Sequence, residues 1–175
     1  MQEPEVDELI DLFARLFKET EKTILVKGED EPIYLPADQD NPYHRVIFAH
    51  GFYASALHEI AHWCVAGPQR RQLEDFGYWY KPDGRSADEQ AEFEKVEVRP
   101  QAFEWLMSKA AGHKFNFSAD NLAANMGASD SFKAQVLATV HDLLDQGLPE
   151  RVAMLVDALC QQSGRGPLHK SEFQL

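Results

Sequence analysis

An H-E-x-x-H motif is formed by His58, Glu59 and His62, within the stretch that runs from His50 to Trp63. On an α-helix, residues four apart are offset by about 40° around the axis and by one turn along it, so the two imidazoles can point at one position. Glu59 flanks that position without occupying it. The motif therefore predicts a metal site carried by a single helix.

The neighbours of the two histidines favour this metal site. The same stretch carries apolar residues that suit a buried helix face, namely Ala54, Leu57, Ile60, Ala61 and Val65. Burying this face would carry His58 and His62 inward, and a buried polar group without a partner is costly. A bound metal removes that cost. The alternative is a pair of core histidines satisfied by hydrogen bonds.

Two imidazoles hold a transition metal weakly, so a third ligand is expected from another part of the chain. Glu97 is preferred because it lies between Val96 and Val98, where an unpaired carboxylate would be hard to explain. Its alternative role is an exposed helix charge. Glu94 is the reserve carboxylate, and the other donors in the sequence are Glu92, His44, His50 and His113.

Two histidines and one carboxylate leave coordination positions open, and the metal decides what these can do. With zinc, the set activates water and Glu59 is the general base of a peptidase or endoribonuclease. With iron(II), the same set binds O2 and supports hydroxylation of C–H bonds. The spacing does not choose between them. A third alternative is an interaction module that holds no metal.

Composition narrows the class of protein. The 175 residues are expected to form one domain, residues 1–175, with a flexible tail from about residue 163. A formal charge of -12 argues against nucleic acid as the ligand and favours a cationic substrate. Cys64 and Cys160 belong to no C-x-x-C pair and are predicted to be reduced thiols. No signal peptide or membrane span is predicted, so a cytoplasmic protein is expected.

The elements that must position the motif lie before and after it. Apolar residues at helical spacing predict a first helix between Val6 and Phe17. Residues 23–26 and 33–35 are β-prone and are joined by a turn-rich connection suited to a hairpin. A more buried strand, residues 45–49, leads into the motif helix, which should end near Gly67 and Pro68.

The second half of the chain is expected to be mostly helical, which makes the fold α+β: a small sheet packed with helices, the motif helix at its centre and a helical C-terminal half. A helix capped by Ser86 should meet a kink or a new start at Pro100. Pro149 is placed at the first position of a later helix. The other predicted segments are an aromatic β-like run at 75–80 and helices at 119–124, 131–144 and 151–160.

Several blocks of the sequence resemble the bacterial elongation factor P hydroxylase family. They are residues 27–38 (KGEDEPIYLPAD), 48–56 (FAHGFYASA), 58–64 (HEIAHWC), 75–80 (DFGYWY) and 96–102 (VEVRPQA). The resemblance covers most of residues 5–160. It implies a compact α+β fold related in shape to small metal-dependent endoribonucleases.

This resemblance also implies an activity and its site. Members of the family hydroxylate a lysine side chain of elongation factor P after a β-lysyl group has been attached, and they are associated with a two-His-one-carboxylate site of the iron type. By position, His58 and His62 are the implied ligands and Glu97 is the matching carboxylate. Fe(II) with O2 is then the expected cofactor chemistry, zinc is the alternative metal, and Glu59 takes a supporting role beside the ligands.

A β-lysylated lysine carries amino groups, so an acidic mouth would attract it. Acidic residues flank two of the matching blocks, although ordinary solvated loop charges are the alternative. Tyrosines near the same blocks could wall a channel for a long aliphatic side chain, or could belong to the core. The predicted substrate contacts are Glu29, Asp30, Tyr34, His50, Tyr53 and Tyr78.

Overall fold

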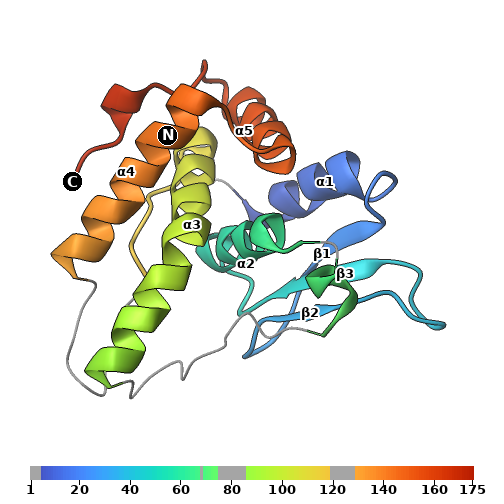
Figure 1. The fold of residues 1–175 in the computed structure, drawn as a ribbon. Helices are drawn as coiled ribbons and strands as arrows, with labels where there is room; N and C mark the ends of the chain where they lie inside the picture. The colour runs from blue at the N-terminus through green and yellow to red at the C-terminus, as the bar shows by residue number, and fades with distance from the viewer. Residues whose placement is uncertain (1–4, 68, 75–85, 119–128) are drawn as a thin grey trace.

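The computed structural model describes residues 5–67, 69–74, 86–118 and 129–175 of the chain (Figure 1). Its helices are α1 (Val6–Phe17), α2 (Tyr53–Val65), α3 (Ala87–Ala111), α4 (Asp130–Gln146) and α5 (Glu150–Ser163), with 3-10 turns η1 (Arg70–Gln72) and η2 (Lys170–Glu172). Its strands are β1 (Thr23–Lys27), β2 (Ile33–Leu35) and β3 (His44–Phe48). The expected α+β class with a helical C-terminal half is confirmed.

The three strands form one mixed sheet in which β3 is central, with the order β1-β3-β2. β1 runs parallel to β3, with Thr23 opposite His44, and β2 runs antiparallel to β3, with Tyr34 opposite Val46. The predicted hairpin between the first two strands is therefore wrong. β2 is instead the antiparallel partner of β3, across the connection of residues 36–43, and β1 takes the other edge of β3, where α1 packs against it.

α2, which carries the H-E-x-x-H motif, lies in the middle of the molecule and packs against α1, α3 and β3 (Figure 1). Its Trp63 is buried between α1 and α5. The Trp63 ring lies 5.1 Å from that of Phe13 and 4.9 Å from that of Phe17, and the Arg151 guanidinium lies 4.4 Å from it. Because these aromatic rings are buried, they set the rotation of α2 about its axis and so determine which of its faces points away from α1.

α3 is a single helix from Ala87 to Ala111, so the new helix start predicted at Pro100 is wrong, while the alternative of a kink there stays a prediction. Ser86 begins it with a capping box: its hydroxyl accepts from the Glu89 amide, and the Glu89 carboxylate accepts from the Ser86 amide. The proline removes one backbone hydrogen bond. Burial of the turns that follow, from Gln101 to Ser108, outweighs that loss and continues the helix.

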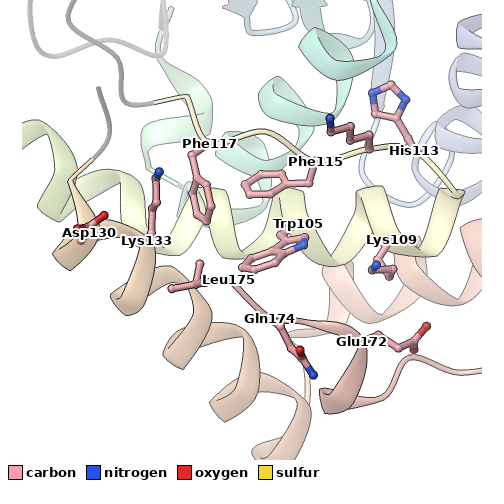
Figure 2. A pocket seen from close by; sticks show the side chains of 11 residues that line it. Trp105, Lys109, His113, Phe115, Phe117, Asp130, Lys133, Glu172, Gln174 and Leu175 are labelled. Atoms are coloured by element: carbon pink, nitrogen blue, oxygen red, sulfur yellow. The ribbon is translucent and has the colours of Figure 1, made fainter. Parts of the chain in front are cut away.

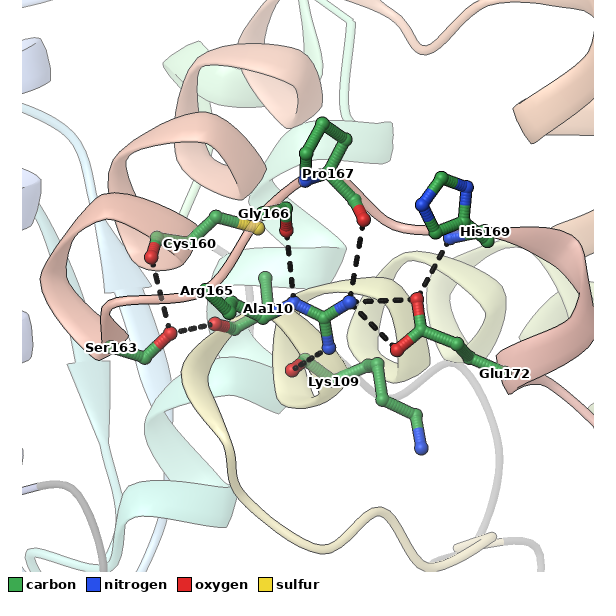
Figure 3. A network of polar contacts seen from close by, with 9 residues as sticks. All are labelled: Lys109, Ala110, Cys160, Ser163, Arg165, Gly166, Pro167, His169 and Glu172. Carbon is green, nitrogen blue, oxygen red and sulfur yellow. Dashed lines mark hydrogen bonds and ion pairs between the residues drawn. The ribbon is translucent and has the colours of Figure 1, made fainter.

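α4 lies on the side of α3 that faces away from the sheet, and α5 packs against both α3 and α1 (Figure 1). α5 begins after Pro149, which is the residue before the helix and not its first residue. After α5 the tail returns to α3: Phe173 is fully buried, and Arg165 pairs with Glu172 and bonds the Lys109 carbonyl (Figure 3). The flexibility expected for this tail stays a prediction.

Two predicted segments, the aromatic run at 75–80 and the helix at 119–124, lie outside the described residues. Within the part of the chain that is described, no helix is both long and apolar enough to cross a membrane.

Candidate metal centre

His58 and His62 of α2 and Glu97 of α3 meet between the two helices. One ligand atom from each residue can be chosen so that all lie within 4.8 Å of one another. His62 Nε2 is 3.1 Å from Glu97 Oε2, and His58 Nε2 is 3.8 Å from Glu97 Oε1. These three side chains have the types and the spacing of a metal site with one face left open.

The turn before α2 sets the position of the two histidines. His50 and Gly51 both have positive φ, 59° and 71°, and turn the chain from β3 into the helix. The His50 amide donates to the Glu29 carbonyl at 2.8 Å. This bond holds the loop after β1 beside the beginning of α2, and Asp30 Oδ1 of this loop lies 3.9 Å from His50 Nδ1.

His62 gives the clearest sign that an ion is expected between these residues. Its Nε2 is buried and has no hydrogen-bond partner among the described residues. The carboxylate of Glu97 is close enough, but the contact lacks the direction of a hydrogen bond. A cation placed between the nitrogen and the carboxylate would satisfy both, so the donor set fits a metal.

Glu104 is a member of the site that the sequence analysis did not identify. Its Oε1 lies 2.7 Å from His58 Nδ1, and its carboxylate is buried. A proton held on Nδ1 by this carboxylate leaves the Nε2 lone pair free, on the side where Glu97 lies. A histidine that ligates a metal is commonly oriented in this way.

Glu104 belongs to a stripe of polar residues along α3, formed by Glu97, Gln101, Glu104 and Ser108. All four are buried, and they recur every three or four residues on one helix face. Gln101 Nε2 donates to Glu97 Oε1 at 3.4 Å and to Ser118 Oγ at 2.8 Å, and the Ser118 amide donates back to Gln101 Oε1. Gln101 therefore links the site to the chain that follows α3.

A pocket of about 450 Å³ opens beside this group. His58, Glu59 and Glu104 line it together with Asp30 and His50. Three of these residues carry carboxylates, and one lysine, Lys114, also lines the pocket, so that its charge is acidic on balance, as a cationic side chain would need. Of the three candidate ligands, His58 is therefore the one that also lines the pocket.

The other predicted substrate residues lie elsewhere, and their role in binding stays a prediction. Glu29 is exposed beside Asp30 but does not line the pocket. Tyr34 lies on β2 and donates to the Arg71 carbonyl. Tyr53 is buried at the beginning of α2 with its ring 5.1 Å from that of His113, and Tyr78 lies outside the described residues.

Two reserve ligands have different partners. Glu94 accepts hydrogen bonds from the amide and hydroxyl of Ser129, at 3.0 Å and 2.8 Å, and so joins α3 to the beginning of α4. His44 Nδ1 accepts from the Ala37 amide at 2.9 Å. Both residues are used in structural bonds away from His58 and His62.

The charges around His58 favour a cation. Burial acts to lower the pKa of His58, but Glu104, through its charge and its hydrogen bond, together with Glu59 and Glu97, raises that pKa to about 10. Burial raises the pKa of Glu59. Burial also acts to raise the pKa of Glu97, but the adjacent His62 and His58 outweigh it and lower the pKa. The site therefore stabilises positive charge, whether as a proton or as a metal ion.

Comparison with known proteins gives two findings. A family model described as elongation factor P hydroxylase matches residues 12–173. A protein of Haemophilus influenzae named elongation factor P lysine hydroxylase is 54% identical over 157 residues, which cover 90% of this chain and 88% of that protein. Both matches include α2 and α3, and so include all the residues of the candidate site.

Proposed function

The chain belongs to the elongation factor P hydroxylase family, and we propose on that basis that it hydroxylates the β-lysylated lysine of elongation factor P. The observation that carries the proposal is the meeting of His58, His62 and Glu97 beside an acidic pocket. The pocket offers Asp30 and Glu59 to the amino groups of the modified lysine. Their carboxylates would attract and orient a cationic side chain.

His58, His62 and Glu97 are the proposed ligands of an iron(II) ion, with zinc as the alternative metal. Bound iron(II) in such a site supplies O2 binding and the oxidation of a C–H bond. One oxygen atom enters the C–H bond of the substrate, and the other leaves as water with two protons and two electrons from an external reductant. The polar residues of α3 hold the ligands in place: Glu104 keeps the proton on His58 Nδ1, and Gln101 donates to Glu97.

The direct test is intact-mass analysis of β-lysylated elongation factor P after incubation with the protein, iron(II), O2 and a reductant. One inserted oxygen adds roughly 16 Da, the mass expected of a single hydroxylation. Elemental analysis of untagged protein purified without added metal accompanies it. A folded, iron-loaded protein that adds no oxygen to the modified substrate would sink the proposal. If the unaltered protein holds no metal, and replacing His58 or His62 does not change its metal content, the protein would be a metal-free interaction module.

Replacing Glu104 with Gln should weaken metal binding about 10- to 100-fold, because the amide keeps the size of the side chain but no longer fixes the charge and the proton of His58. Metal affinity is measured by competition with a chelator. Glu94→Gln is the matched control, since Glu94 is on the same helix and bonds Ser129. Equal affinities in the two variants would remove Glu104 from the site.

Replacing Glu59 with Gln separates the hydroxylase from the hydrolase. In a hydroxylase, the variant should keep its metal and retain part of its hydroxylation rate, because Glu59 lines the pocket and is not one of the proposed ligands. In a hydrolase, where Glu59 is the general base, the same substitution should lower the cleavage rate about 10²- to 10⁴-fold. A variant that retains zinc and loses cleavage of a peptide or an RNA, with no effect on hydroxylation, would favour the hydrolase.

A further inference from the structure

A second pocket, of about 610 Å³, lies between α3, α4, the tail and the segment 113–117 (Figure 2). Its centre is aromatic. The Trp105 ring stacks on Phe115 with 5.2 Å between centroids, and Phe117 meets both rings edge-on at 5.5 Å and 5.0 Å. Figure 2 shows Phe115 and Phe117 reaching from their segment toward Trp105. These rings give the pocket apolar walls.

The rim of this pocket is cationic, in contrast to a chain with a formal charge of -12. Lys109, Lys114 and Lys133 line it, and none of the three makes an ion pair with a carboxylate among the described residues. Of the two acidic side chains on the rim, Asp130 and Glu172, that of Glu172 accepts from Arg165 at 2.7 Å through both oxygens (Figure 3). The unpaired charge at the rim is therefore predominantly positive.

The second pocket is adjacent to the pocket beside His58. His113, Lys114 and Phe117 line both. Figure 2 shows His113 on the opposite side of the segment from Phe115, and its ring lies 5.1 Å from that of Tyr53. At the end of the segment, Ser118 bonds Gln101, which bonds Glu97. One short piece of chain thus separates an acidic pocket from a basic one.

We propose that the basic aromatic pocket docks an acidic segment of the protein substrate that also presents an apolar side chain, while the modified lysine enters the pocket beside His58. This inference rests on the proposed function, since it requires a protein substrate. A surface with adjacent acidic and basic pockets orients a partner of opposite pattern and raises its rate of encounter. The apolar walls add contact area once the partner has arrived.

The test uses a double variant, Lys109→Gln with Lys133→Glu, because these two lysines line the second pocket and not the first. Its control is Lys18→Gln with Lys22→Glu, which makes the same change in net charge on exposed residues near α1 and β1. Hydroxylation rates are measured with full-length β-lysylated elongation factor P and with a short peptide carrying the same modified lysine. Thermal unfolding checks that each variant is folded. If the double variant is not, the single variant Lys133→Glu is used in its place.

The double variant should raise KM for the full-length substrate about tenfold at low ionic strength with kcat unchanged, and added salt should reduce the effect. KM for the peptide should not change. An unchanged KM for the full-length protein, or an equal rise for protein and peptide, overturns the inference. A double variant that loses binding to a single-stranded oligoribonucleotide but shows no change in KM also overturns the inference. If the unaltered protein hydroxylates neither substrate, the proposed function itself fails.

Discussion

Replacing Glu97 with Gln is expected to lower metal affinity by more than about 100-fold and to bring hydroxylation below detection. Residues one step outside a metal site already change affinity about 10- to 100-fold, and Glu97 is a proposed ligand. The substitution removes the charge opposite His62 Nε2, a buried nitrogen with no other partner among the described residues. Two imidazoles would then remain to hold the ion.

Metal content and chelator competition are the measurements for this variant, with hydroxylation of the modified substrate as a second readout. Glu92→Gln is the matched control, because Glu92 is an exposed glutamate on the same helix. Glu97→Asp should restore part of the affinity, since it keeps the charge on a shorter side chain. Full metal binding by a folded Glu97→Gln protein would show that the third ligand is another residue.

Replacing Phe173 with Ala should lower the free energy of unfolding by about 3–5 kcal/mol, the usual cost of removing a buried aromatic ring. The Phe173 ring is fully buried, with its centroid 5.5 Å from that of Trp105. For a chain of this size, that corresponds to a fall of roughly 10 °C in the midpoint of thermal unfolding. The loss should also detach the tail from α3 and remove one wall of the basic aromatic pocket.

Unfolding by heat and by denaturant measures this effect, and limited proteolysis reports on the tail. Leu175→Ala is the control, since the Leu175 side chain is 69% exposed and its truncation should be nearly neutral. If Phe173→Ala unfolds at the same temperature as Leu175→Ala, the tail contributes little to stability and has the flexibility expected from the sequence.

The parts of the site that depend on local spacing could be predicted from the sequence. His58 and His62 are four residues apart on an apolar helix, so a shared target followed from helix geometry. Glu97 was preferred because it lies between two valines, and its side chain is 5% exposed, but Val96 is itself 48% exposed, so the flanking valines are not the cause of that burial. The structure brings these three residues together, while their role as ligands remains a proposal.

The parts that depend on packing between distant elements could not be predicted. Nothing local distinguishes Glu104 or Gln101 from ordinary helix residues until α3 is placed against α2. The repeat of polar residues at 97, 101, 104 and 108 was the available signal, and it required knowing that α3 continues through Pro100. The hairpin was wrong for the same reason, since the pairing of β1 with β3 depends on α1 covering β1.

The contact between His62 and Glu97 joins α2 to α3 across all of the chain between them. An ion held by residues of both helices would close that stretch into a ring, much as a disulfide does. Ring closure removes conformations from the unfolded chain, and its entropy rises only slowly with loop length. The ion would then be a removable cross-link as well as a reagent, so that chelation would lower the unfolding temperature even in a protein that is never offered a substrate.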